Sequence, residues 1–322
     1  MKLLEVDGLS THYVSAGGTR VTRAVDKVSF SLDAGGTLGV VGESGSGKTT
    51  LALSLLRLLP TAARIVGGAI RFEGDDLLTK SDAEMRRIRG KRMAMILQDP
   101  MASLDPLFTV GDQVAETLRA HEHVNRRRAW AKARDLLAAV RIAAPAQRVR
   151  EFPHQLSGGM RQRIVGAIAI SCEPRLLIAD EPTTSLDVTI QAQYLSLLRD
   201  LQREHGLALI FITHNLGIVA KMCDSVAVMY AGRLVESGPV RQIFTAPTHP
   251  YTKALIESIP RLGDSTVRLT AIDGQPPDPS ALPSGCAFHP RCPKAMERCR
   301  IEAPPDVQVA DGQMTACWLW AP

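Results

Sequence analysis

The sequence predicts an α/β protein in which a mostly parallel sheet is flanked by helices. Between residues 25 and 229, short apolar runs of strand length alternate with helix-forming segments, a pattern typical of parallel sheets with helices on their faces. A glycine-rich loop ending in a lysine follows one of these runs, and a stretch rich in Ala, Leu, Arg and Gln separates two others. We therefore expect a nucleotide-binding core with an inserted helical subdomain.

Seven apolar runs have the length and composition of strands. They are Val25–Leu32, Leu38–Val41, Ala69–Phe72, Met93–Leu97, Leu176–Ala179, Leu209–Thr213 and Ser225–Met229. A helix is expected over Thr49–Leu59, where Pro60 stops it. Helices are also expected over residues 110–170, with breaks at Pro145 and Pro153.

Composition narrows the class of protein. The 322 residues, 45% of them apolar, suffice for more than one compact unit. The net charge is only +5, and the basic clusters Arg86–Arg92 and Arg126–Arg128 lie among helix-forming residues. We interpret them as solvated helix faces, or a surface near anionic lipid, rather than as a nucleic-acid site.

No apolar run approaches the ~20 residues that span a bilayer. Glu5 and Asp7 interrupt the N-terminal region before any secretory signal forms. We expect a cytosolic chain, so other subunits would supply any membrane part.

The glycine-rich loop fits the pattern G-x-x-x-x-G-K-[ST], between a strand and a helix, which is the context that supports a phosphate-binding loop (P-loop). Its backbone N–H groups and the helix N-terminus would face phosphates. Lys48 would reach the β- and γ-phosphates, and Thr49 would ligate Mg²⁺. The expected ATP contacts are Gly42, Glu43, Ser44, Gly45, Ser46, Gly47, Lys48, Thr49 and Thr50.

An acidic pair follows the buried run Leu176–Ala179. Open α/β sheets bind ligands at the carboxyl ends of their strands. Asp180 would therefore hold Mg²⁺, and Glu181 would orient and deprotonate the water that attacks the γ-phosphorus.

Two further polar residues follow strands. Gln98 comes after Met93–Leu97, and His214 after Leu209–Thr213. Gln98 would touch Mg²⁺ or the attacking water, and His214 would hydrogen-bond the γ-phosphate.

A second anion-binding helix start lies in the segment Leu156–Gln162, which reads LSGGMRQ. The expected contacts are Ser157, Gly158 and Gly159, whose backbone N–H groups open the helix that follows. One chain does not need two such helix starts for a single ATP.

In this order, the loop, the LSGGM segment and the acidic pair resemble those of ATP-binding cassette (ABC) proteins. The resemblance implies a RecA-like core with an antiparallel β subdomain and a helical subdomain at about residues 99–170. It also implies a head-to-tail dimer in which Ser157, Gly158 and Gly159 contact the ATP of the opposite subunit. Asp187 in Ser185-Leu186-Asp187 matches the D-loop at that interface. Met160 replaces the usual fifth residue, Gln.

Tyr13 is the aromatic residue best placed before the loop to stack on adenine. The alternative is an ordinary strand aromatic with no ligand.

Further segments resemble the dipeptide and oligopeptide importer ATPases, most of all the D-type subunit of dipeptide permeases. They are residues 98–106, 182–193, 229–232, 249–255 and 285–293. Nickel and glutathione importers share much of the pattern. His214 matches the histidine of the family's H-loop. The next residue is Asn215, where the subfamily more often has Asp.

The resemblance implies an ATP-hydrolysing subunit that powers peptide import from the cytoplasmic face of the inner (plasma) membrane. Its partners would be a second, related ATPase (giving a heterodimer), two transmembrane permease subunits and an extracytoplasmic substrate-binding protein. A groove lined by residues 98–114 would receive a permease helix. No nucleic-acid partner is implied.

We expect an ABC domain at residues 1–245, after which the amino-acid composition changes. Residues 246–322 are rich in Pro and hold four of the six cysteines. With little periodicity left, we expect a small extension that needs a cross-link in place of a core.

Those cysteines are Cys286, Cys292, Cys299 and Cys317. Their spacing matches neither a zinc ribbon nor a ferredoxin. Members of the peptide-importer subfamily with this pattern carry a four-iron four-sulfur (4Fe-4S) cluster, so the resemblance implies that cofactor. Zinc and free thiols stay open as alternatives.

Two other classes compete. A soluble ABC ATPase acting on DNA or ribosomes usually carries two cassettes or a long coiled coil, and this chain shows neither. A degenerate, metal-binding regulator is disfavoured by the intact Lys48, Asp180, Glu181 and His214.

Overall fold

The structure, a computed structural model, describes the chain except residues 16, 19, 185, 260–271 and 322. It divides into two compact units. Unit 1 comprises Met1 and residues 33–36 and 79–210. Unit 2 comprises residues 2–32, 37–78 and 211–322.

Unit 2 contains a four-stranded sheet in the order β2-β1-β4-β5. The strands are β1 (Lys2–Val14), β2 (Val21–Asp33), β4 (Ala63–Phe72) and β5 (Asp75–Asp76). β1 runs antiparallel to β4, with Leu4 opposite Phe72. β1 was not among the predicted strands. Its start alternates buried Leu4 and Val6 with Glu5 and Asp7, as a half-solvated strand does.

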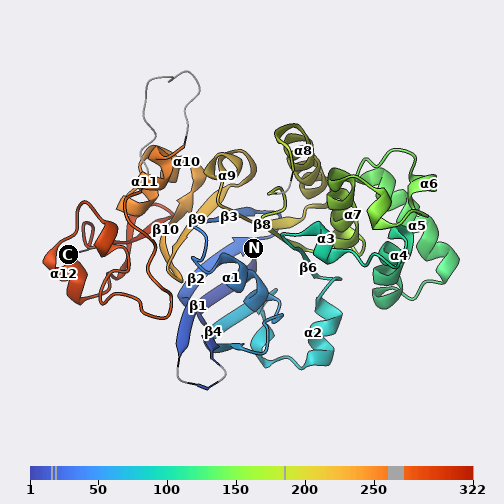
Figure 1. Ribbon diagram of the computed structural model, residues 1–322. Coiled ribbons are helices and arrows are strands. Elements are labelled where there is room, and N and C mark those ends of the chain that lie inside the picture. Colours follow the sequence, from blue (N-terminus) through green and yellow to red (C-terminus); the bar gives the residue numbers. More distant parts are fainter. Residues whose placement is uncertain (16, 19, 185, 260–271, 322) are drawn as a thin grey trace. The chain divides into compact units, whose positions relative to one another are not determined.

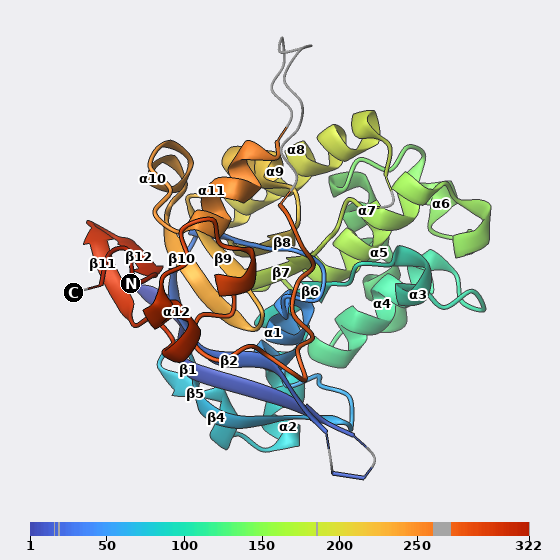
Figure 2. The same cartoon turned by 60° about the vertical axis from the view of Figure 1, so that its left-hand side comes forward.

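A second sheet of unit 2 follows the order β11-β12-β10-β9-β3. These strands are β3 (Thr37–Val41), β9 (Ser225–Tyr230), β10 (Arg233–Pro239), β11 (Asp306–Ala310) and β12 (Gln313–Ala316). β3 is parallel to β9, and the other pairs are antiparallel. The C-terminal hairpin β11–β12 therefore extends the sheet at β10 (Figure 2).

The helices of unit 2 are short. They are α1 (Lys48–Leu55), α9 (Leu216–Met222), α10 (Val240–Thr245), α11 (Pro250–Glu257) and α12 (Glu297–Ile301), with 3-10 turns η1 (Leu77–Thr79) and η3 (His289–Arg291). α1 ends at Leu55 rather than at the predicted Leu59, because Arg57 adopts a left-handed backbone with φ 52°.

The C-terminal residues of unit 2 share an apolar core with the strands. Tyr251 of α11 and Phe288 before η3 are buried, at 0% and 1% exposure, in one cluster with Val41, Val228 and Tyr230. The extension thus has a core in common with β3 and β9, where the sequence predicted that it lacked one.

Unit 1 carries the helices predicted for residues 110–170 (Figure 1). Its elements are α2 (Asp82–Ile88), β6 (Met93–Ile96), α3 (Pro100–Ser103), α4 (Val110–His121), α5 (Arg126–Ala139), α6 (Pro145–Arg148), η2 (Pro153–Gln155), α7 (Gly158–Ile170), β7 (Leu176–Asp180) and α8 (Val188–His205). α4 and α5 pack on each other and on α7. Pro145 and Pro153 begin α6 and η2, because proline fits the first turn of a helix.

β6 and β7 pair in parallel within unit 1. β8 (Ala208–Thr213) carries the chain from unit 1 into unit 2. Each of the seven predicted strands is therefore present, with ends that shift by a few residues or, in β2 and β4, extend further.

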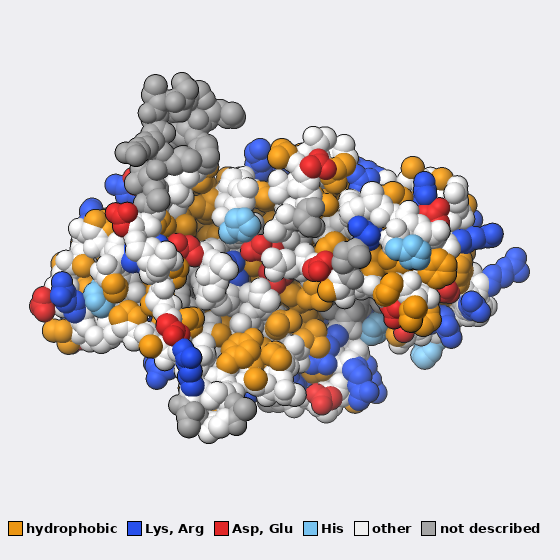
Figure 3. All heavy atoms as spheres, viewed as in Figure 1, with side chains coloured by type: hydrophobic (Ala, Val, Ile, Leu, Met, Phe, Trp, Pro, Cys, Tyr) orange, Lys and Arg blue, Asp and Glu red, His pale blue; other side chains and the backbone are white. Residues whose placement is uncertain are grey.

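Arg126–Arg128 are exposed at the start of α5, and Figure 3 shows Lys and Arg side chains at the surface over this part of unit 1. Within the described residues, no helix has the length and apolar character needed to cross a bilayer.

Candidate nucleotide-binding and catalytic site

The P-loop of unit 2 joins β3 to α1. Gly47 precedes the helix with φ 102°, a conformation that favours glycine. A Cβ at this position would lie 2.0 Å from the carbonyl oxygen of Ala24. Only glycine therefore fits here, and the N-terminus of α1 opens toward the loop as a phosphate site requires.

Lys48 is 6% exposed and its ammonium group is held inside the loop. Nζ donates to the carbonyl oxygens of Gly42 (2.9 Å) and Glu43 (2.8 Å) and to Oγ of Ser46 (3.4 Å). The loop backbone therefore curls around the lysine, as in a phosphate cradle.

Thr49 and Thr50 follow Lys48 in the first turn of α1. Thr49 is exposed, so its hydroxyl is accessible. Thr50 Oγ1 lies 3.4 Å from the hydroxyl of Tyr13, which is half-buried on β1. Tyr13 thus lies next to the P-loop helix, as an adenine-stacking residue would.

His214 comes directly after β8 and is exposed. Asn215 caps α9, because its Oδ1 accepts from the N–H groups of Gly217 (2.9 Å) and Ile218 (3.3 Å). Asn and Asp are similar N-caps, so the departure at Asn215 preserves the start of α9.

In unit 1, Glu181 follows the buried end of β7. Its backbone is left-handed, with φ 44°, which costs a non-glycine residue about 1–2 kcal/mol. The carboxylate accepts from Gln98 Nε2 (3.3 Å) and from Thr184 Oγ1 (2.9 Å). Asp180, one residue earlier, is 1% exposed.

Ser157 begins α7. Its Oγ accepts from the N–H of Met160 at 3.4 Å, so it is the N-cap of that helix. A Cβ on Gly159 would lie 2.8 Å from Cγ2 of Ile190, whereas Gly158 faces open space. Gly159 is therefore required by packing against α8, and Gly158 leaves room for an approaching ligand.

Asp187 is the N-cap of α8. Oδ1 accepts from the N–H groups of Thr189 (3.1 Å) and Ile190 (3.0 Å). Ser185 of the predicted D-loop lies outside the described residues.

The structure thus brings the predicted site residues together in two sets. Unit 2 joins the P-loop, from Gly42 to Thr50, with Tyr13. Unit 1 joins Gln98 with Glu181. The proposed Mg²⁺ ligands are a threonine hydroxyl, a glutamine amide and an aspartate, all oxygen donors suited to this cation.

The four late cysteines lie in unit 2. The pKa of Cys286 is raised to about 11, mainly by burial and to a smaller extent by the other three thiols. Burial also raises the pKa of Cys292 and Cys317. Among the described residues, however, no three His, Cys, Asp or Glu side chains are placed to hold a metal ion. The iron–sulfur prediction therefore gains no support from the geometry of these residues.

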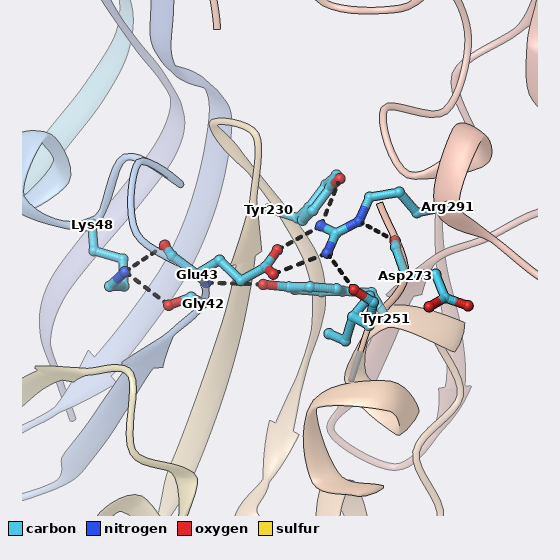
Figure 4. A network of polar contacts seen from close by, with 8 residues as sticks. Gly42, Glu43, Lys48, Tyr230, Tyr251, Asp273 and Arg291 are labelled. Atoms are coloured by element: carbon cyan, nitrogen blue, oxygen red, sulfur yellow. Dashed lines mark hydrogen bonds and ion pairs between the residues drawn. The ribbon is translucent and has the colours of Figure 1, made fainter. Parts of the chain in front are cut away.

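Sequence reasoning missed two residues that contact the P-loop. The Tyr251 hydroxyl accepts from the Glu43 N–H at 2.9 Å, and Arg291 forms two hydrogen bonds with the Glu43 carboxylate (Figure 4). Both residues fall in C-terminal segments that resemble peptide-importer sequences, which was the only available signal.

A cavity of about 1030 Å³ also lies in unit 2. It is lined by parts of β1, β2 and β10 and by the C-terminal residues, including Cys286. None of the described residues that line it belongs to the P-loop, so this cavity is not the proposed nucleotide site.

The strand–loop–helix unit with a buried lysine is a P-loop, and the LSGGM start of α7 and the acidic end of β7 accompany it, as in ATP-binding cassette proteins. The ABC transporter family model matches residues 25–184, and the model of the oligopeptide/dipeptide transporter C-terminal region matches residues 235–299. The chain belongs to the ABC transporter ATP-binding proteins that carry this C-terminal region.

Several curated proteins are similar along nearly their whole length. The probable peptide ABC transporter ATP-binding protein y4tR of Sinorhizobium fredii is 50% identical over 318 residues, covering 98% of this chain and 94% of that protein. The dipeptide transport ATP-binding protein DppD of Bacillus subtilis is 48% identical, covering 99% and 95%. DppD of Escherichia coli is 46% identical, covering 98% and 96%.

Solved structures share the fold. The dimeric ATP-binding cassette MJ0796, described as bound to ADP and Pi, aligns with a TM-score of 0.66 at 22% identity, covering 74% of this chain and 99% of that one. The cassette cbiO1 from Clostridium perfringens aligns with a TM-score of 0.64 at 25% identity, covering 76% and 91%.

Proposed function

We propose that this chain hydrolyses ATP to power the import of di- and oligopeptides through a membrane ABC transporter. The observation that carries the proposal is the pairing, in one chain, of the P-loop around Lys48 with the C-terminal region of peptide transporters. The relatives named for dipeptide transport, which match along the whole chain, support the same substrate class.

In unit 2, the loop would bind the phosphates of ATP. Lys48 would exchange its carbonyl partners for the β- and γ-phosphates, and Tyr13 would stack on adenine. Thr49 would contribute its hydroxyl to Mg²⁺, and His214 would hydrogen-bond the γ-phosphate. The exposed positions of Thr49 and His214 support these roles.

In unit 1, Glu181 would act as the general base. Gln98 and Thr184 hold its carboxylate by hydrogen bonds, which fixes the oxygen that would take the proton from water. Gln98 and Asp180 would contribute oxygen ligands to Mg²⁺, whose charge would offset the negative charge on the transferred phosphoryl group.

The signature residues Ser157, Gly158 and Gly159 would bind the ATP of a facing cassette, with Asp187 at the same interface. The N-terminus of α7 supports this role, because helix starts attract anions. The facing subunit would be a second, related ATPase, which makes the working pair a heterodimer.

The membrane partners would be two permease subunits that dock near residues 98–114. In this segment Leu107 is 79% exposed and Phe108 is 54% exposed, and exposed apolar side chains are typical of docking surfaces. The chain would thus lie at the cytoplasmic face of the membrane, with an extracytoplasmic binding protein delivering the peptide. We place the ABC domain at residues 1–245, with its helical subdomain at about 99–170, and the extension at residues 246–322.

The finer prediction of a 4Fe-4S cluster on Cys286, Cys292, Cys299 and Cys317 stays a proposal. It rests on the four cysteines themselves, all of which lie in the C-terminal extension, and on the resemblance of residues 285–293 to peptide-importer sequences. A hydrogen bond from the Cys286 N–H to the Cys299 carbonyl oxygen at 2.8 Å holds the backbones of two of these residues together.

Reconstitution tests the function. The full chain would be placed in proteoliposomes with two permease subunits, a second ATPase and a binding protein from the same organism, and uptake of labelled dipeptide, nickel and glutathione would be compared. We expect ATP-dependent uptake of the peptide, with none for Lys48→Ala. Uptake of nickel or glutathione alone would replace the peptide assignment, and hydrolysis without any transport would overturn the proposal.

A further inference from the structure

One residue of the P-loop, Glu43, is held through all of its polar groups. Its N–H donates to the Tyr251 hydroxyl (2.9 Å), and its carbonyl oxygen accepts from Lys48 (2.8 Å). Its carboxylate accepts two hydrogen bonds from Arg291, at 2.7 and 3.0 Å. Figure 4 shows Glu43 between Lys48 on one side and Arg291 and Tyr251 on the other.

Contacts other than Glu43 also hold the Arg291 side chain in place. Its side chain is only 4% exposed. It also donates to the Tyr230 hydroxyl (3.3 Å) and to the carbonyl oxygens of Asp273 (3.0 Å) and Ile272 (3.4 Å). A guanidinium group held in this way presents a rigid, two-pronged donor to a carboxylate.

Tyr251 is equally constrained. It is fully buried on α11, and its ring lies 4.6 Å from that of Tyr230 and 5.3 Å from that of Phe288. Phe288 and Arg291 both belong to the short segment between Cys286 and Cys292. That segment therefore supplies both the packing and the charge that support the loop.

These contacts reach Lys48 of the P-loop through Glu43. Lys48 Nζ binds the carbonyl oxygens of Gly42 and Glu43, and Glu43 is the residue that Tyr251 and Arg291 hold. The C-terminal extension thus fixes the peptide groups that position the ammonium group.

We propose that Arg291 and Tyr251 are positioning residues for nucleotide binding, and that they order the P-loop through Glu43. A loop ordered by protein contacts loses less conformational freedom when it binds a ligand, and the affinity rises accordingly. The inference rests on the proposed function, because it takes the P-loop as the ATP site.

The test measures the Kd of MgATP for the purified full-length chain by isothermal titration. We expect Arg291→Ala and Glu43→Gln each to weaken binding about tenfold, the scale of coupled contacts in one network. The double variant should be no weaker than either single variant, because both remove the same pair. In the assembled transporter, Arg291→Ala should raise KM and leave kcat at saturating ATP within about twofold.

The matched control is Arg20→Ala. Arg20 pairs with Asp278 of the extension at 2.7 Å, so this contact also joins an arginine to a carboxylate. The pair is exposed, however, and Asp278 and Ser280, which accept from Arg20, lie outside the P-loop. We expect this variant to bind MgATP within about twofold of the original chain, on the scale of exposed ion pairs.

The positioning role of Arg291 can be refuted in two ways. A Kd within twofold for Arg291→Ala, or strictly additive losses in the double variant, would overturn the positioning role. If Arg291→Ala does not fold, Arg291→Lys and Glu43→Gln carry the test, since lysine keeps the charge but loses the fork and should bind at intermediate strength. Lys48→Ala checks the P-loop itself. Unaltered binding in that variant refutes the proposed ATP site and the positioning role with it, whereas lost binding in Lys48→Ala together with unaltered binding in Arg291→Ala overturns the positioning role alone.

Discussion

Gln98 donates a hydrogen bond from its Nε2 to the carboxylate of Glu181 across 3.3 Å. The two residues follow neighbouring parallel strands, β6 and β7, so the pairing is a direct product of the sheet. Thr184 donates to the same carboxylate oxygen, and the backbone of Glu181 is left-handed. Strained backbone at such a position is typical of functional sites.

We expect Glu181→Gln to abolish ATP turnover and to retain bound ATP. Glutamine fills the same volume but cannot take a proton, so steady-state hydrolysis in the assembled transporter should fall ~10²-fold or more. Phosphate release and bound nucleotide should be measured on the same samples. Hydrolysis within about threefold of the original chain would contradict the role of Glu181 as general base.

Ser157→Arg should separate binding from hydrolysis. Because Ser157 is proposed to serve the ATP of the facing cassette, MgATP binding to the isolated chain should stay within about twofold while hydrolysis in the complex falls ~10²-fold, the scale of a lost charge-stabilising donor. Ser157→Thr, which keeps a capping hydroxyl for α7, is the control for folding. Equal loss of binding in the isolated chain would mean that the signature acts within its own subunit.

Two glycines of the P-loop should differ in their tolerance of alanine. Gly47→Ala places Cβ 2.0 Å from a backbone oxygen, whereas Gly45→Ala meets nothing within 4 Å, although both have positive φ. We expect Gly45→Ala to lower the free energy of unfolding by about 1 kcal/mol and Gly47→Ala by clearly more, at least about 2 kcal/mol. Urea unfolding of the two variants checks this, and equal losses would refute the close approach.

The free energy of unfolding should fall as the pH is lowered, because His249 is buried in its neutral form. Burial lowers its folded-state pKa to about 3 from 6.5, so the unfolded chain binds the extra proton between those pH values. This contribution to the free energy of unfolding is complete above about pH 6.5 and is lost progressively down to about pH 3.

His249→Asn tests that contribution. His249 Nδ1 accepts from the Tyr251 N–H at 3.1 Å as the cap of α11, and asparagine also caps. Between pH 7.5 and 5, the original chain should lose about 2 kcal/mol more than the variant in urea unfolding. Parallel pH profiles would show that His249 does not titrate as argued.

The four-cysteine proposal has its own readout. Protein purified without oxygen should be brown, absorb near ~400 nm and contain about four iron atoms per chain. Replacing any one of the cysteines by Ser should lower the iron content and increase proteolysis after residue 280, while ATP binding survives. Stoichiometric zinc in colourless protein would support the zinc alternative, and protein with neither metal would leave free thiols.

The phosphate loop and the strands were predictable because they depend on local pattern: Gly47 and Lys48 are adjacent in the sequence, and Val40 and Val41 sit in an apolar run. Strand β1 was missed because Glu5 and Asp7 break up its apolar residues. The Arg291–Glu43 pair could not be predicted, since 248 positions separate the two residues and no periodicity encodes such a contact. The extension was expected to lack a core because the tertiary burial of Tyr251 and Phe288 leaves no trace in local composition.

The close approach of Gly159 to Ile190 joins two motifs that the sequence presents as separate. A Cβ added at Gly159 would lie 2.8 Å from Cγ2 of Ile190, so the first turn of α7 packs against the first turn of α8, which Asp187 caps. The signature and the D-loop helix therefore form one mechanical edge. A facing subunit that meets one of these helix starts would therefore meet the other beside it.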